Sequence, residues 1–214
     1  VIADDVFSAI GLSKAAIYVK GMLGLIEYPP EHYDTIVTVA ATSEGISRRE
    51  IGRHRWASLK PMWNMSKEGF KQLYDQIPGE KLGFEESWKL TSGNPKMFAE
   101  LYNVNWHMDE VLNDMASSRS LREFINALTS IEKRWLWEAI DDPDTLFVRE
   151  RMSLLSRLVE LNLMIDDIPI RKPYLWIDEP PPERDPELGI GEYVAWQTPL
   201  HREVIKSMLK GIES

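Results

Sequence analysis

Two neighbouring carboxylates near the start of the chain are the residues whose types and spacing best suit chemistry. Residues 1–7 are apolar and β-branched around Asp4 and Asp5, which predicts a buried strand with both acids near its carboxyl end. In phosphoryl transfer, the first carboxylate of such a pair holds hydrated Mg²⁺ and the second polarises the attacking water. The alternative is that both acids only cap the helix that follows.

A second group of polar residues follows another apolar stretch. Residues 35–41 are small or β-branched throughout and lead into Thr42, Ser43 and a basic segment that includes Arg53. A hydroxyl at this point can lie near a γ-phosphate or an attacking water, and an arginine after it can stabilise phosphoryl charge. The alternative is a turn followed by a solvated basic helix.

The third feature is the break at Gly93, Asn94 and Pro95. Proline is favoured as the first residue of a helix, and a helix N-terminus attracts anions through its free amide groups. The same three residue types also begin helices that bind nothing.

The elements that must position these residues change type along the chain. A strand in residues 1–7, a helix from about residue 13 to residue 28, and a strand in residues 35–41 predict a βαβ crossover in a parallel sheet. Ligands of such sheets lie beyond the carboxyl ends of the strands. From Ser66 onward, helical periodicity predicts helices within residues 66–78, 84–90, 95–102, 109–115 and 121–128.

The last third has the pattern of a winged-helix domain. It predicts helices at residues 130–140, about 148–162 and 201–212, and strands at 163–165, 174–177 and 193–196, the last two forming a hairpin around a proline-rich loop. Three arginines near the second helix could contact DNA phosphates: Arg149, Arg151 and Arg157. Acidic residues in the loop would repel DNA: Asp178, Glu179, Glu183, Asp185 and Glu187.

Composition limits the classes of protein to be considered. The 214 residues carry a net charge of −9 and no cysteine, which excludes disulfides, thiolate zinc sites and cysteine nucleophiles. No apolar run approaches the roughly 20 residues of a membrane span. We therefore expect a cytoplasmic protein without a membrane partner, and the acidic balance disfavours DNA as a partner.

Taken in order, these motifs resemble the archaeal P-loop ATPases of the AAA+/STAND group. Residues 1–5 are similar to the end of the Walker B strand, and residues 39–45 to the sensor strand and its exit. Gly52 and Arg53, followed by residues 59–62 and 66–68, are similar to the family's Gly-Arg and Leu-x-Pro-Phe-Ser-x-Glu turn, with residues 63–65 inserted. Residues 91–95 are similar to the Gly-Gly-x-Pro turn of the helical lid.

The resemblance implies an α/β region followed by a mostly α region. Its parts would be the C-terminal part of a P-loop core (residues 1–65), a helical lid (66–128) and a winged-helix domain (129–214). It also implies roles for single residues. These are Asp4 toward Mg²⁺ through water, Asp5, Thr42, Ser43 and Arg53 in catalysis, and Gly93, Asn94 and Pro95 in nucleotide binding.

One departure from the family decides the expected activity. The Walker A motif, Gly-x-x-x-x-Gly-Lys-Ser/Thr, does not occur in this sequence, so the cradle for the β- and γ-phosphates is lacking. We expect a C-terminal ATPase portion that is inactive alone, with ATP and Mg²⁺ as cofactors of the full-length protein and none bound to this chain alone. Expected partners are the missing N-terminal ATPase half, another chain, or a second copy. The alternative is a non-enzymatic winged-helix module that binds DNA or protein.

Overall fold

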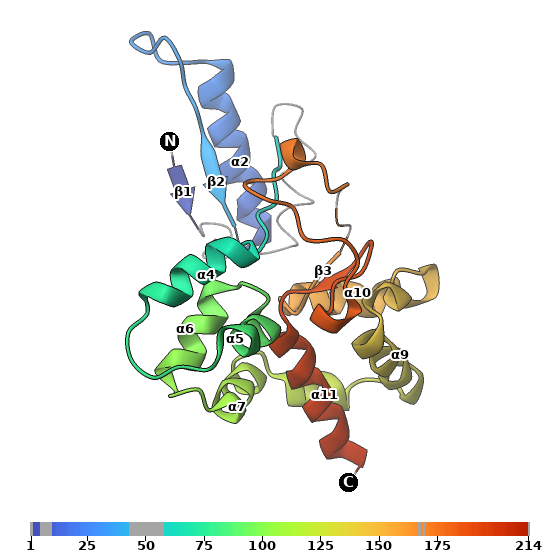
Figure 1. Ribbon diagram of the computed structural model, residues 1–214. Coiled ribbons are helices and arrows are strands. Elements are labelled where there is room, and N and C mark those ends of the chain that lie inside the picture. Colours follow the sequence, from blue (N-terminus) through green and yellow to red (C-terminus); the bar gives the residue numbers. More distant parts are fainter. Residues whose placement is uncertain (1, 5–9, 43–57, 167, 169, 214) are drawn as a thin grey trace. The chain divides into compact units, whose positions relative to one another are not determined.

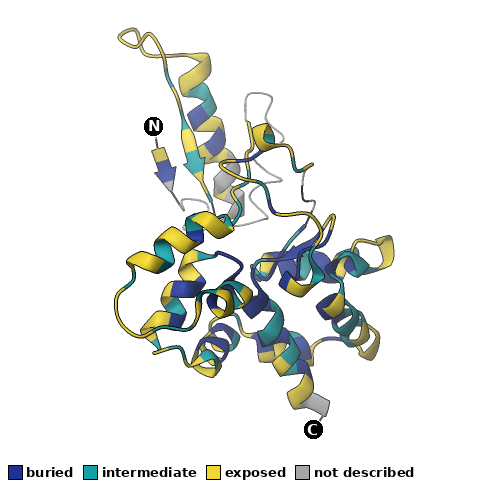
Figure 2. Ribbon diagram, in the orientation of Figure 1, coloured by how far each residue is buried: buried dark blue, intermediate teal, exposed yellow. Residues whose placement is uncertain are grey.

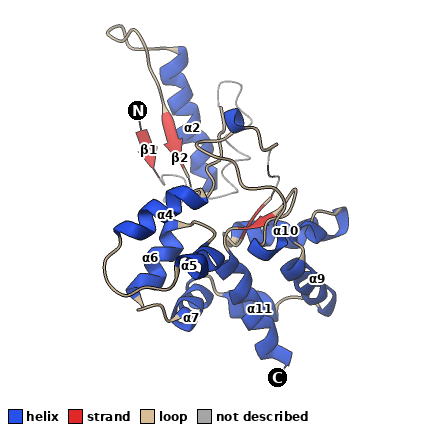
Figure 3. Ribbon diagram, in the orientation of Figure 1, coloured by secondary structure: helices blue, strands red, loops and turns tan. Residues whose placement is uncertain are grey.

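A computed structural model describes residues 2–4, 10–42, 58–166, 168 and 170–213 (Figure 1). The chain divides into two compact units, Val1–Lys60 and Pro61–Ser214. Among the described residues, helices predominate and strands are short (Figure 3). No described helix is long and apolar enough to cross a membrane.

The first unit contains the predicted strand, helix and strand. They are β1 (Ile2–Asp4), α2 (Leu12–Glu27) and β2 (Val39–Ala41). The two strands pair in parallel with Ile2 opposite Val39 and Asp4 opposite Ala41, which confirms the predicted parallel crossover. A small apolar cluster of Ala3, Val19 and Met22 joins the helix to the sheet. The second strand is shorter than predicted, because only its last three residues pair.

The described part of the second unit begins with five helices, two of which start at a side-chain cap. The five helices are α4 (Lys67–Gln76), α5 (Phe84–Thr91), α6 (Pro95–Asn103), α7 (Met108–Ser118) and α8 (Leu121–Asn126). The Ser66 hydroxyl accepts a hydrogen bond from the Gly69 N–H at 3.2 Å and caps α4. The Asn94 side chain caps α6 in the same way, and Pro95 is the first residue of that helix. These two helix starts confirm the sequence predictions.

The C-terminal part combines three α-helices with four 3₁₀ turns and two short strands. In chain order they are α9 (Ser130–Asp141), η1 (Pro143–Leu146), η2 (Arg149–Arg151), α10 (Met152–Glu160), β3 (Met164–Ile165), η3 (Pro173–Leu175), η4 (Pro186–Leu188), β4 (Ala195–Trp196) and α11 (Pro199–Glu213). The strands β3 and β4 pair antiparallel, with Met164 opposite Trp196. Thr129 and Glu132 form a capping box at the start of α9.

The predicted hairpin between residues 174–177 and 193–196 is wrong. Residues 173–175 form the turn η3, which begins at Pro173, and β4 pairs with β3 instead. Trp176 lies 4% exposed in a cluster with Ile168, Leu188, Ile190 and Ala195. The apolar run therefore buries one side chain in a cluster rather than extending as a strand.

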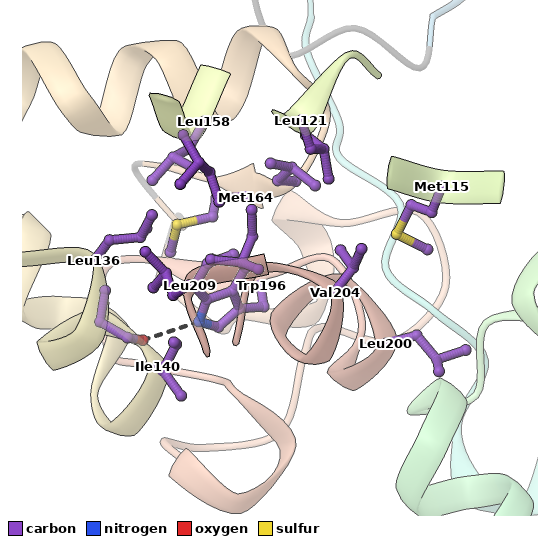
Figure 4. Close-up of a cluster of buried hydrophobic side chains, with 14 of the residues drawn as sticks. Met115, Leu121, Leu136, Ile140, Leu158, Met164, Trp196, Leu200, Val204 and Leu209 are labelled. Carbon is purple, nitrogen blue, oxygen red and sulfur yellow. Dashed lines mark hydrogen bonds between the residues drawn. The ribbon is translucent and has the colours of Figure 1, made fainter. Parts of the chain in front are cut away.

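The main core of the second unit is continuous from α6 to α11 (Figure 2). At its centre, Trp196 is fully buried and its indole N–H donates to the Ala139 carbonyl at 3.0 Å (Figure 4). Leu121 of α8, Leu158 of α10 and Val204 of α11 belong to the same apolar cluster. The elements on both sides of residue 128 thus share one core.

Candidate functional site

The sheet of the first unit brings two predicted site residues to one edge. Asp4 is the last residue of β1 and lies opposite Ala41, the last residue of β2, so Thr42 follows directly at the same end. In a parallel pair these are the carboxyl ends, where ligands of such sheets bind. Asp5, Ser43 and Arg53 lie outside the described residues.

The residue types at this edge suit magnesium and phosphate. Mg²⁺ prefers oxygen ligands and is commonly held by one or two carboxylates together with waters and substrate phosphates. The Asp4 carboxylate and the Thr42 hydroxyl are groups of that chemistry. In the described parts of the chain, no group of three or more His, Asp or Glu side chains gathers to hold a metal.

In the second unit, the turn at Gly93 interlocks with residues 64–66. The Met65 N–H donates to the Gly93 carbonyl at 3.1 Å. Gly93 has φ +79°, and a Cβ atom there would collide with the Met65 carbonyl and stand 2.9 Å from Trp88 Cζ3. Only glycine fits this backbone conformation and this close approach. The segment 64–66 and the turn at Gly93, which resemble two separate motifs of the ATPase family, are thus in direct contact.

Asn94 joins this turn to a third segment. Its side-chain oxygen accepts from the Met97 N–H at 3.0 Å, and its amide group donates to Asn64 Oδ1 at 2.8 Å. The Asn64 amide group in turn donates to the Gln197 carbonyl at 3.0 Å, just after β4. Sequence reasoning missed Asn64, although it lies in the three-residue insertion that distinguishes this turn. The chain of bonds connects Asn94 with the segment between β4 and α11.

One family model matches the part of the chain that contains both sets of residues. Residues 1–101 match the model of an ATPase domain found predominantly in Archaea. This part of the chain belongs to that archaeal ATPase family. The matched region includes β1, β2 and the Gly93–Pro95 turn, and it ends within α6. No curated protein and no solved structure matches the chain.

The second unit has a pocket of about 210 Å³ beside the interlocked turns. It is lined by Trp63, Asn64, Met65, Ser66, Lys67, Trp88, Ser92, Glu179, Pro180 and Pro182. Two half-buried indoles, two prolines and opposite charges thus surround one opening. Gly93, Asn94 and Pro95 are not among its lining residues.

The three arginines that were candidates for DNA contacts differ in their surroundings. Arg151 pairs with Glu138 at 2.5 Å and lies over the Trp135 ring, 5.3 Å from its centroid. Arg157 pairs with Glu132 at 3.3 Å. Arg149 is exposed. Two of the three guanidinium groups therefore form contacts within the chain, and DNA binding stays a prediction.

His201 is a buried titratable group that the sequence analysis did not include among the site residues. It is 2% exposed at the start of α11, with Nδ1 2.7 Å from the Thr198 hydroxyl and Nε2 3.4 Å from Arg119 Nη2. Arg119 has only donors, so Nε2 accepts and Nδ1 carries the hydrogen that points to Thr198. Burial, together with the charges of Arg119 and Lys96, lowers the pKa of His201 to about 3. The ring is therefore neutral at pH 7.

Proposed function

We propose that this chain is the C-terminal portion of an ATP-binding switch of the AAA+/STAND type. The observation that carries the proposal is the parallel register of β1 and β2, within a region that belongs to an ATPase family. It brings the end of the predicted Walker B strand and the end of the predicted sensor strand to the same edge, where nucleotide chemistry needs them.

The proposed roles follow from residue type and place. Asp4 holds hydrated Mg²⁺, and Asp5 polarises the attacking water. Thr42 or Ser43 contacts the γ-phosphate or that water. Arg53 stabilises the charge on the transferred phosphoryl group. In the second unit, Gly93, Asn94 and Pro95 are the proposed nucleotide contacts of the lid.

The proposal includes a partner segment. Because no Walker A motif occurs in these 214 residues, the amide cradle and the lysine for the β- and γ-phosphates have to come from another polypeptide segment. ATP hydrolysis is therefore a property of the assembled protein, and we propose that this chain alone is inactive.

The proposed role of residues 129–214 is internal signalling rather than DNA binding. The contacts of Asn64 with Asn94 and with the Gln197 carbonyl link the proposed nucleotide contact to the β4–α11 segment. The ion pairs of Arg151 and Arg157 also support an internal role, since paired guanidinium groups are less available to phosphates. This region would then report the nucleotide state through its contacts with the lid.

Calorimetry with Mg²⁺ and ATP tests the proposal. It is carried out on the 214-residue chain and on the chain completed with a segment containing Gly-x-x-x-x-Gly-Lys-Ser/Thr. We expect binding only by the completed protein, and Asp5→Asn should reduce its hydrolysis at least about a hundredfold while ATP binding persists. The matched control is Asp34→Asn, which changes an exposed carboxylate of the same unit. Hydrolysis that is unchanged in Asp5→Asn, or absence of binding by the completed protein, would contradict the proposal.

A further inference from the structure

We propose that the pocket beside Trp63 and Trp88 binds the arginine side chain of a partner peptide. The proposal concerns the second unit alone and does not rest on nucleotide binding. Its basis is the combination of aromatic walls, a serine hydroxyl at the pocket and an unpaired carboxylate at the rim. The volume, about 210 Å³, suits one long side chain rather than a folded domain.

The aromatic walls are held in place by the surrounding structure. Trp63 and Trp88 are half-buried and pack against the cluster that contains Trp176. Pro182 also lines the pocket and is fixed by Arg171, whose Nε donates to the Pro182 carbonyl at 2.8 Å. A pocket whose walls are preorganised spends little conformational entropy when it binds.

Ser92 supplies the polar group inside the pocket. It is only 3% exposed and lines the pocket, yet its hydroxyl has no hydrogen-bond partner among the described residues. Its backbone is left-handed, with φ 49°. A serine hydroxyl that lines a pocket can accept a hydrogen bond from a ligand N–H.

The charges at the rim favour a cation. Lys67 is paired with Glu85 at 2.8 Å, so their charges compensate each other. Glu179 has no ion pair and no hydrogen bond among the described residues, and the neighbouring Asp178 and Glu183 are exposed acids. The net charge of Lys67, Glu85 and Glu179 is therefore −1, and the surrounding loop adds further negative charge.

The aromatic walls and the Glu179 carboxylate favour arginine over lysine. A planar guanidinium stacks on an indole face and forms two parallel hydrogen bonds with one carboxylate, whereas an ammonium does neither as well. Glu179 would accept the paired bonds, and the Ser92 hydroxyl would accept another N–H.

Nuclear magnetic resonance of the indole N–H groups tests this site with Nα-acetyl-arginine methylamide as the probe. Signals are assigned with Trp63→Phe and Trp88→Phe. We expect saturable shifts of the Trp63 and Trp88 signals at millimolar probe, with no shift of Trp196, whose N–H is bonded in the core. The citrulline analogue, which has the same shape and no charge, should bind at least about fivefold more weakly.

Two variants and a matched control connect the binding to the named groups. Glu179→Gln and Ser92→Gly should each weaken probe binding at least about threefold, since each removes a hydrogen-bond acceptor. Glycine also suits the left-handed backbone at residue 92, so that variant should fold. Glu183→Gln removes a nearby carboxylate that does not line the pocket and should leave binding unchanged. Equal binding of the arginine and citrulline probes, an equal effect of the two glutamate variants, or no shift at either indole would overturn the proposal.

Discussion

The backbone carbonyl of Met65 occupies the space that a Cβ atom on Gly93 would need. The Met65 N–H also donates to the Gly93 carbonyl. Both the N–H and the carbonyl of Met65 are therefore in close contact with the backbone of Gly93. This contact joins the entry to α4 with the turn before α6. It explains why the position requires glycine beyond its positive φ alone.

Replacing Gly93 with alanine should therefore be costly. The left-handed backbone costs a residue with a side chain roughly 1–2 kcal/mol, and the collision with Met65 and Trp88 adds about 1–3 kcal/mol. We expect Gly93→Ala to lower the unfolding free energy in urea by about 2–5 kcal/mol. The control is Gly79→Ala, because Gly79 has φ +86° and open space around it. This variant should lose only the roughly 1–2 kcal/mol that comes from the left-handed backbone. Equal losses in the two variants would contradict the steric account.

Asn64 and Asn94 should be coupled energetically. Removing either amide group breaks their 2.8 Å hydrogen bond, and Asn64→Ala also frees the Gln197 carbonyl. In a double-mutant cycle with Asn94→Ala, we expect a coupling of about 0.5–1.5 kcal/mol in the unfolding free energy. Asn94→Ser separates two effects, since serine retains the helix cap but is too short to reach Asn64. Additive losses would show that the two residues act independently.

His201 should make stability depend on pH. Its pKa is about 3 when folded and about 6.5 when unfolded, so between these values the unfolded chain binds a proton that the folded chain excludes. Stability is thus lost as pH falls below 6.5. Between pH 7 and pH 5, the loss from this group is about 2 kcal/mol. In urea unfolding at a series of pH values, the neutral variant His201→Gln should lack this part of the change in unfolding free energy with pH. Parallel pH curves for the two proteins would contradict the low pKa.

Arg151 and Arg149 separate an internal role from a DNA-binding role. Arg151→Ala removes the Glu138 ion pair and the contact with the Trp135 ring, so we expect a loss of about 1–2 kcal/mol in unfolding free energy. Arg149→Ala should change stability by less than about 0.5 kcal/mol, because this side chain is exposed. In fluorescence anisotropy with duplex DNA at low salt, we expect no binding by the unmodified chain or by either variant. Duplex binding that weakens in Arg149→Ala would favour the DNA-binding role.

Features that depend on near neighbours in the chain could be predicted from the sequence. The start of α4 after Ser66 and the start of α6 at Pro95 were predicted from the sequence. In the structure, the Ser66 and Asn94 side chains each accept a hydrogen bond from a backbone N–H three residues later. The strand, helix and strand of the first unit followed from apolar patterning, and the parallel pairing confirmed them. These signals are local and hold wherever the rest of the chain lies.

The sequence by itself determined the helix starts, the order of elements and the residue types of an ATPase region. Only the tertiary structure decided which segments meet. Residues 174–177 have the composition of a strand, but Trp176 is buried in a cluster and β4 pairs with β3. Likewise, no local pattern indicates that Asn64 bonds with both Asn94 and the Gln197 carbonyl. Such choices depend on the burial and hydrogen bonding of groups far apart in the chain, whose competing partners become distinguishable only when the whole core packs.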